Sequence, residues 1–254
     1  MLFDTHAHYY DERFDSDRDE LLTALPEQGV ELVLCPGCDL PSSRGCVELA
    51  VRYPYIYAAV GVHPGDCGDW MDEDLAKLRD LAVHPKVRAI GEIGLDYYWK
   101  DNPPKEFQQN VFRRQLELAQ ALHLPVIVHD REAHGDSLAI VKEFPEVTGV
   151  FHCYSGSVEM ARELVALGWY LGFDGPVTYK NARKALEVLE AVPLERILVE
   201  TDAPYMAPEP FRGRRNHSGY VYRMAETVAQ VKGLSTEEAE RQTTANGRRL
   251  FSIV

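Results

Sequence analysis

LFDTHAHYY (residues 2–10) places two histidines two positions apart, directly after a short apolar run. In a β-strand, side chains two positions apart point to the same face, so His6 and His8 would face one point with Asp4 on the same side. Imidazole and carboxylate groups that converge in this way suit a metal ion. His-x-His also occurs by chance, so the rest of the chain has to decide what the pair does.

Further short apolar runs follow along the chain, each bounded by glycine or proline and almost continuously apolar. Such runs are typical of strands that are buried on both faces of a parallel sheet. Between them lie stretches with helical spacing, one beginning at a capping serine, Ser157, and one opening with a capping box from Ser235 to Glu238. The predicted strands lie in residues 1–5, 30–37, 55–64, 87–96, 125–130, 149–156, 170–175 and 196–204.

Eight strands that alternate with helices in 254 residues predict one (β/α)8 TIM barrel, with residues 1–254 forming a single domain. The alternative is a doubly wound open sheet, in which a glycine-rich phosphate-binding turn usually follows the first strand. In this chain that turn holds His6 and His8, which favours the barrel. A barrel places its active site at the carboxyl ends of the strands.

The composition predicts a cytoplasmic protein with no membrane contact and no obligate protein partner. Its net charge is -13, so a nucleic-acid substrate would have to be captured locally, by bound cations or a small basic patch. No apolar run suits a secretory signal or a membrane span. The five cysteines are an odd number and argue against a disulfide framework. Cys35 and Cys38 lack a second pair at zinc-finger spacing, so we interpret them as incidental thiols.

Histidine or carboxylate side chains follow most of the predicted strands. Burial of such a set without a cation would leave carboxylates repelling one another and imidazoles unpaired. The set exceeds the roughly three protein ligands that one catalytic zinc takes, so two divalent cations bridged by Glu92 fit better. In strand order the residues are His6, His8, His63, Glu92, His129, His152, Glu200 and Asp202, with Asp174 a weaker candidate after the seventh strand.

The motifs around these residues resemble, in order, the successive motifs of the TatD-family metal-dependent hydrolases. The resemblance runs from residue 3 to the closing TTANGRRLF (243–251) and so covers essentially the whole chain. It implies a TIM barrel of the amidohydrolase superfamily with a two-metal centre. The matching motifs are DTHAH (4–8), GVHP (61–64), GEIGLDYY (91–98), HDREA (129–133), FHCYSG (151–156) and VETDAPY (199–205).

The resemblance also implies which residues hold each metal ion. Two departures from the family pattern leave these ligands intact and bear on substrate contacts instead. In the family an acidic residue often follows the second histidine closely, whereas here Tyr9 and Tyr10 separate His8 from Asp11. Residues 215–218 read RNHS, whereas the family often reads RNEP. The implied ligands are His6, His8, Glu92 and Asp202 for the first ion, and Glu92, His129 and His152 for the second.

Family members are described as deoxyribonucleases, commonly exonucleases that shorten single-stranded DNA from the 3′ end, and some act on RNA or on D-aminoacyl-tRNA. We therefore expect metal-dependent phosphodiester hydrolysis on single-stranded DNA or RNA, with Asp202 as general base. One alternative is a carbonyl hydrolase, such as a D-aminoacyl-tRNA deacylase or lactonase. Many such relatives carry a carboxylated lysine on the fourth strand, and this chain has none there. A non-catalytic scaffold would be expected to have lost some of the ligands.

Other side chains near the predicted mouth suit substrate contacts. His63 is expected either to donate a hydrogen bond to the phosphate or leaving group, or to support a ligand. Residues 97–99 (YYW) either stack on bases or pack over the barrel, and packing is the favoured interpretation. Arg212 and Arg214 belong to the same basic cluster as Arg215. The predicted substrate contacts are His63, Arg131 and Arg215, and the carboxylates predicted to orient ligands are Asp4 and Glu200.

Overall fold

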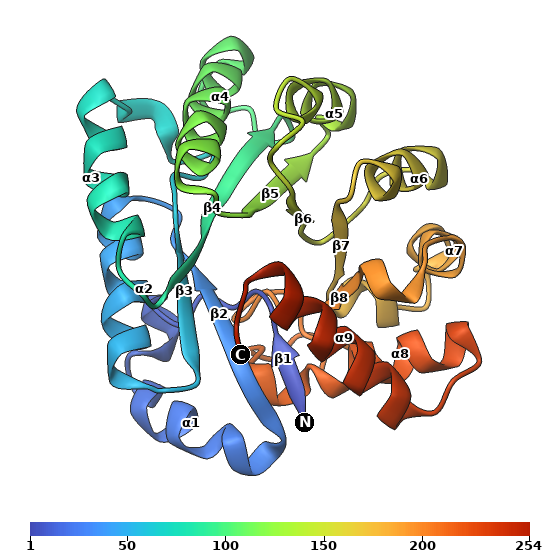
Figure 1. The fold of residues 1–254 in the computed structure, drawn as a ribbon. Coiled ribbons are helices and arrows are strands. Elements are labelled where there is room, and N and C mark those ends of the chain that lie inside the picture. The colour runs from blue at the N-terminus through green and yellow to red at the C-terminus, as the bar shows by residue number, and fades with distance from the viewer.

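The computed structural model describes residues 1–254 and contains one sheet of eight parallel strands in the order β1 to β8. Helices surround this sheet on its outer side, and the strands curve around a common axis (Figure 1). The predicted TIM barrel is therefore confirmed. The strands are β1 (Leu2–Asp4), β2 (Val30–Pro36), β3 (Ile56–Val60), β4 (Val87–Asp96), β5 (Val126–Arg131), β6 (Gly149–Phe151), β7 (Tyr170–Phe173) and β8 (Ile197–Val199).

Helices follow each strand and carry the capping groups expected from the sequence. Ser157 accepts a hydrogen bond from the Met160 amide at the start of α6, and Ser235 and Glu238 form the capping box of α9. No helix is both long and apolar enough to cross a bilayer. The helices are α1 (Arg18–Ala24), α2 (Leu40–Arg52), α3 (Asp72–Ala82), α4 (Lys105–Leu122), α5 (His134–Lys142), α6 (Val158–Ala166), α7 (Arg183–Ala191), α8 (Tyr222–Lys232) and α9 (Thr236–Leu250).

The barrel closes between β8 and β1 through the residues that follow these two short strands. The Asp202 amide donates to the His6 carbonyl at 2.8 Å, and the His8 amide donates to the Ala203 carbonyl at 2.7 Å. Ala7 and Ala203 form a parallel bridge in the same seam. The backbone bonds that close the barrel therefore bring the His-x-His segment and Asp202 side by side.

An apolar cluster fills the barrel interior and closes its amino-terminal end. Phe3 of β1 packs there with the end of the chain, and its ring lies 6.0 Å from that of Phe251. Leu250 and Ile253 belong to the same cluster, and α9 lies beside β1 in Figure 1. Because this end is plugged, polar side chains can gather only at the opposite, carboxyl end of the strands.

Gly247 on α9 allows the helix to lie close against β1. A Cβ atom at this position would lie 2.7 Å from Cδ1 of the fully buried Phe3 and 3.1 Å from Cγ2 of Thr5. Alanine favours a helix by about 1 kcal/mol over glycine, but overpacking a core costs about 1–3 kcal/mol. We therefore expect Gly247→Ala to lower the melting temperature by a few degrees in calorimetry.

Gly135 in α5 provides the matched control, because a Cβ atom there would meet nothing within 4 Å. Gly135→Ala should keep or slightly raise the melting temperature, through helix propensity alone. Equal melting temperatures for the two variants would contradict the close contact between α9 and β1.

Candidate metal centre

The carboxyl ends of the strands bring the predicted metal ligands together at one mouth of the barrel. Their ligand atoms fall into overlapping groups in which all atoms lie within 4.8 Å of one another. All of these side chains except the partly exposed His129 are buried. The six residues that the fold assembles are His6 and His8 after β1, Glu92 on β4, His129 on β5, His152 after β6 and Asp202 after β8.

The first group joins the His-x-His pair to one oxygen each of Glu92 and Asp202. The Nε2 atoms of His6 and His8 lie 3.0 Å apart. Glu92 Oε2 lies 3.3 Å from His6 Nε2 and 3.6 Å from His8 Nε2, and Asp202 Oδ1 lies 3.2 Å from His8 Nε2. Ligands of a tetrahedral ion with bonds of about 2.0–2.2 Å lie roughly 3.3–3.6 Å apart. The spacing of this group therefore fits a divalent cation.

The second group uses the other oxygen of Glu92. Oε1 lies 2.9 Å from His129 Nδ1 and 3.0 Å from His152 Nε2, and these two nitrogens lie 3.4 Å apart. Three protein ligands with room beside them are typical of catalytic metal sites. Because each Glu92 oxygen faces a different pair of imidazoles, the carboxylate stands where a bridging ligand would.

The carboxylates and imidazoles of the centre stabilise each other's charged forms. Burial alone would raise the pKa of Glu92, but the neighbouring His152 and His6 imidazoles outweigh it and hold this pKa well below its usual range. Burial also opposes ionisation of Asp202, yet the hydrogen bond with His8 and the nearby imidazoles lower its pKa. The Nδ1 atoms of His6 and His152 are buried without a partner. Ionised carboxylates and converging imidazole nitrogens form a donor set that suits divalent cations.

Asp202 occupies a backbone conformation that fixes its direction. Its φ is +56°, a left-handed value that aspartate and asparagine adopt more readily than most residues. The carboxylate therefore projects from a sharp turn directly after β8, held by the bond from its own amide to His6.

Asp4 does not orient the His6 imidazole, contrary to the expectation from the shared strand face. Its carboxylate accepts hydrogen bonds from the His6 amide at 3.3 Å, the Thr201 amide at 2.9 Å and the Ser218 hydroxyl at 2.5 Å. Burial raises the pKa of Asp4 to about 7, against the effect of these donors. Asp4 thus ties together the loops that flank Asp202. Asp4 and His6 do not point to the same face because β1 ends at Asp4, and strand alternation no longer applies beyond it.

Glu200 lies where a carboxylate can orient His152. Its Oε1 accepts a hydrogen bond from the Cys153 amide at 2.6 Å and lies 3.6 Å from His152 Nδ1. A Cβ atom at Gly172 of β7 would overlap this carboxylate, so the neighbouring strand needs glycine there. The orienting role of Glu200 stays a prediction that this geometry supports.

His63 lies at the edge of the second group. Its Nε2 is 4.0 Å from Glu92 Oε1, and its ring packs edge-on against His129 with centroids 4.4 Å apart. The Gly65 amide donates to Nδ1 at 3.0 Å, which places the proton of the neutral ring on Nε2. Burial, and then the nearby His129, lower the pKa of His63 to about 3. His63 therefore presents an N–H donor, rather than a charge, to the mouth.

Arg131 and residues 98–99 form an exposed cluster on the rim, which we call the rim aromatic cluster (Tyr98, Trp99 and Arg131). The guanidinium carbon of Arg131 lies 4.0 Å from the Tyr98 ring centroid and 5.3 Å from that of Trp99. Tyr98 is 51% exposed and Trp99 is 57% exposed, so the favoured packing interpretation is wrong for these two. It describes Tyr97 better, because that half-buried side chain donates its hydroxyl to Asp136.

Arg215 is not brought to the metal centre. Its guanidinium forms a two-pronged ion pair with Asp17 at 2.7 and 2.5 Å, donates to the Arg13 carbonyl and lies 4.8 Å from the Phe14 ring centroid. These contacts hold the loop before α1. The pairing with Asp17 argues against the predicted phosphate contact of Arg215, since a basic cluster in sequence does not show which of its members has an acidic partner.

Two further side chains at the centre were missed in the sequence. Asp96 Oδ2 lies 3.1 Å from His129 Nε2, which places it to orient that imidazole. Asp96 shares β4 with Glu92 at an even spacing, so strand alternation could have indicated it. Cys38 Sγ lies 3.9 Å from Glu92 Oε2, whereas Cys35 is buried within β2. Cys35 therefore fits the interpretation of an incidental thiol, whereas Cys38 lies beside a proposed metal ligand.

Asp174, the weaker candidate, belongs to neither group of ligands. Its side chain is buried and its Oδ2 has no hydrogen-bond partner. Burial, and then the charges of Asp202 and Glu200, raise the pKa of Asp174 well above its usual range. The carboxyl group thus lies near the centre without being part of it.

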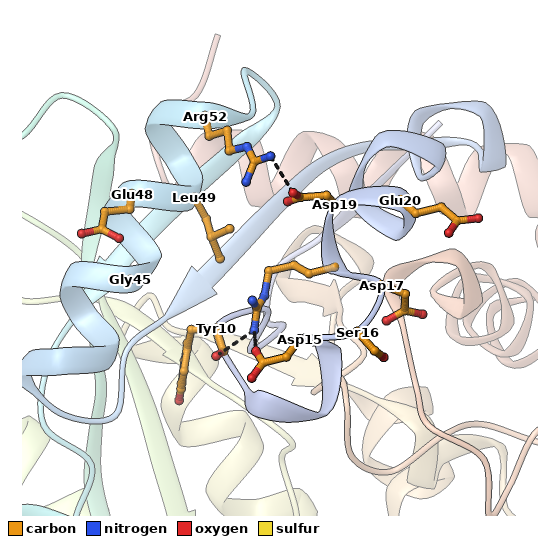
Figure 2. A pocket seen from close by; sticks show the side chains of 11 residues that line it. Tyr10, Asp15, Ser16, Asp17, Asp19, Glu20, Gly45, Glu48, Leu49 and Arg52 are labelled. Carbon is orange, nitrogen blue, oxygen red and sulfur yellow. Dashed lines mark hydrogen bonds and ion pairs between the residues drawn. The ribbon is translucent and has the colours of Figure 1, made fainter.

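A cavity of 660 Å³ lies between α1 and α2, and none of the proposed ligands lines it. Tyr10 in its wall reaches the centre, because the Tyr10 hydroxyl lies 3.2 Å from His8 Nδ1. Figure 2 shows its acidic lining, including Asp15, Asp19 and Glu48. The basic side chains are already paired, since Arg52 contacts Asp19 and Arg18 contacts Asp15. This cavity therefore offers no free cationic group to an anionic substrate.

Comparisons with known proteins agree with this site. A family model described as TatD related DNase matches residues 3–252. A Bacillus subtilis protein named "Uncharacterized metal-dependent hydrolase YabD" is 46% identical over 255 residues, 100% of each chain. A Cronobacter turicensis protein named "3'-5' ssDNA/RNA exonuclease TatD" is 39% identical, over 98% of this chain and 97% of the relative. The crystal structure of YJJV, a TatD homolog from Escherichia coli K12, superposes with a TM-score of 0.93 at 32% identity, covering 100% of this chain and 98% of that one. The chain is therefore a metal-dependent hydrolase that belongs to the TatD related DNase family.

Proposed function

We propose that the chain removes nucleotides from the 3′ end of single-stranded DNA or RNA, using two divalent cations bound at the described centre. The observation that carries the proposal is the position of Glu92, whose two oxygens face separate pairs of imidazoles. The printed name of the Cronobacter relative supports the substrate and the direction. Divalent cations at these ligands would acidify a bound water and neutralise charge on a phosphoryl group.

Asp202 is the residue that we propose to accept the proton of the attacking water. Its pKa lies below the usual range, so the carboxylate is ionised at neutral pH. His8 lies 3.2 Å from Oδ1 and restricts its orientation. The other oxygen of this carboxylate is the one available to a proton, as a general base requires.

His63 is the residue that we propose to hold the phosphate or the leaving group. The neutral ring carries its proton on Nε2, which faces the Glu92 side of the mouth. A preorganised N–H donor stabilises the negative charge that develops on a phosphoryl or leaving oxygen. The expected alternative role, support of a ligand, would use the same Nε2, which lies 4.0 Å from Glu92 Oε1.

The rim offers aromatic and cationic groups to a single strand. The rim aromatic cluster lies at the carboxyl ends of β4 and β5. Tyr205 follows β8, is 43% exposed, and has the Arg13 guanidinium carbon 4.0 Å from its ring centroid. β4 and β8 lie on opposite sides of a barrel with this strand order. Exposed aromatic rings stack on any base, and Arg131 adds local positive charge, whereas Arg13 is paired with Asp11. A single strand could therefore cross the mouth between the two sides.

The proposed function is tested with single-stranded oligonucleotides labelled at either the 5′ or the 3′ end. With Mg, Mn or Zn, the 5′-labelled strand should shorten stepwise, whereas the 3′-labelled strand should release its label as a mononucleotide at once. EDTA should stop both reactions. Internal cuts would contradict the exonuclease mode. Intact strands in protein shown by mass spectrometry to hold two cations would contradict phosphodiester hydrolysis and direct the search to aminoacyl esters and lactones.

Replacement of the rim aromatic cluster should weaken substrate binding while the centre stays intact. Stacking on one aromatic side chain is worth about 1–3 kcal/mol per base, so Trp99→Ala should raise the dissociation constant of a single strand by about 5- to 150-fold. Arg131→Ala should also reduce the salt dependence of binding, by about 0.7 in the logarithmic slope. Fluorescence anisotropy in a metal-loaded, non-cleaving variant measures both quantities.

Arg215→Ala is the matched arginine control. Its guanidinium pairs with Asp17, so the substitution should leave the salt dependence of binding unchanged. It should instead cost up to about 1 kcal/mol of stability, because both partners are partly exposed. A larger loss of binding for Arg215→Ala than for Arg131→Ala would contradict the assignment of Arg131 to the substrate path.

A further inference from the structure

A hollow of 250 Å³ opens beside the metal centre, over the carboxyl ends of β6 and β7. We call it the mouth pocket and define it by residues that line it. Half of its lining residues are hydrophobic, 7 of 14, and two of the others are exposed polar groups, Asn181 and Lys184. The defining residues are Cys153, Tyr154, Phe173, Asp174, Val177 and Tyr179.

The mouth pocket is joined to the centre through the residue that follows a ligand. Cys153 comes directly after His152, and its amide donates to Glu200 Oε1 at 2.6 Å. The same Glu200 oxygen lies 3.6 Å from His152 Nδ1. A group bound to the pocket would therefore lie next to whatever is bound at the second group of ligands.

Asp174 gives the pocket a polar group that lacks a partner. This side chain lines the pocket and is 3% exposed, yet its Oδ2 accepts no hydrogen bond. Buried polar atoms are nearly always paired with protein or water, so the Asp174 carboxyl can still gain a hydrogen bond. The polar edge of a flat, otherwise apolar ligand would supply it.

We propose that the mouth pocket binds the nucleobase of the nucleotide whose phosphate is hydrolysed, with the Asp174 carboxyl hydrogen-bonded to the polar edge of that base. This inference rests on the proposed nuclease function. The volume lies below the roughly 300–1,000 Å³ of pockets for drug-sized ligands and so suits a single base. The Tyr154 and Tyr179 side chains supply aromatic wall, and Lys184 at the rim suits the adjoining phosphate. All four DNA bases carry an N–H donor. We therefore expect the pocket to discriminate strongly between a nucleotide and an abasic residue, and weakly among the four bases.

The first test is a binding measurement that needs no turnover. Isothermal titration calorimetry of the metal-loaded protein compares deoxyadenosine 5′-monophosphate with deoxyribose 5-phosphate, which carries the same phosphate and no base. The base should tighten binding by about 5- to 150-fold, the range known for stacked bases. Equal affinities would overturn the proposal, whatever the protein cleaves.

Two variants locate the effect in the pocket. Ala182→Trp fills the hollow from the start of α7, and Asp174→Ala removes the carboxyl from the wall of the pocket. Each should reduce the ratio of the two affinities, and Ala182→Trp should bring it close to one. Glu187→Gln, on the same helix and paired only with Arg183, is the control and should keep the wild-type ratio. A wild-type ratio in both pocket variants would overturn the proposal, and the second variant decides if the first does not fold.

Cleavage assays separate this inference from the function on which it rests. Oligonucleotides that end in a normal nucleotide or in an abasic residue are compared by kcat/KM. Preference for the normal end, reduced in Ala182→Trp, supports the pocket. Equal cleavage of both ends leaves the nuclease function standing and overturns the pocket. No cleavage of either, in protein with both cations, overturns the nuclease function, and the affinity ratio from calorimetry then decides separately whether the pocket binds a base.

Discussion

Asp202→Asn is expected to lower kcat for phosphodiester hydrolysis by about 10²- to 10⁴-fold while the barrel stays folded. The substitution removes the proposed base and one proposed metal ligand, but keeps the size of the side chain. Asparagine also tolerates the φ of +56° at this position, and the backbone amide of residue 202 can still donate to the His6 carbonyl. Alanine would add backbone strain at this φ, so asparagine separates chemistry from folding more cleanly.

The measurement is kcat on a single-stranded oligonucleotide, with metal content determined on the same samples. Asp136→Asn is the matched control, because that carboxylate bonds to Tyr97 and lies outside the centre. It should retain wild-type activity. Recovery of Asp202→Asn at high metal concentration would show that the residue acts through metal affinity alone, and would contradict its role as general base. Activity within tenfold of wild type would contradict both roles.

The barrel could be predicted because its determinants are local. Each strand is a short apolar run that is buried by its neighbours on both sides, and this pattern survives in the sequence without knowledge of the partners. The positions of the proposed ligands on β5 and after β6 and β8 could be predicted for the same reason. Their positions at the ends of apolar runs follow from strand boundaries, and a barrel brings all strand ends to one mouth.

The contacts that the sequence could not predict depend on partners far along the chain. Arg215 looks like a phosphate ligand in sequence, but Asp17 lies almost two hundred residues away and neutralises it. Asp4 was expected to face His6, yet its hydrogen bonds go to Thr201 and Ser218, which the closing seam brings beside β1. Asp174 looked like a weak ligand, and only the folded chain shows that its oxygen is left unpaired. Such pairings follow from tertiary packing, which no local spacing encodes.

Removal of metal with EDTA is expected to lower the melting temperature of the wild-type protein, and Glu92→Gln is expected to abolish most of this shift. A ligand at a hundredfold excess over its dissociation constant stabilises the folded state by about 2.7 kcal/mol per site. In a chain of this size each kcal/mol moves the melting temperature by about 2–4 °C, so one site accounts for roughly 5–10 °C. Glu92 faces both groups of imidazoles, so its loss should weaken both sites at once.

The decisive comparison is the shift that EDTA causes in each variant, because this difference cancels any effect of Glu92→Gln on the metal-free fold. Metal analysis should find about two ions per wild-type chain and close to none in Glu92→Gln. Glu143→Gln is the control, since that carboxylate pairs with Arg113 on the surface and should keep the wild-type shift. If Glu92→Gln lost one ion and kept the other at full affinity, Glu92 would serve a single site. The arrangement of its two oxygens between His6, His8, His129 and His152 argues that both ions are lost together.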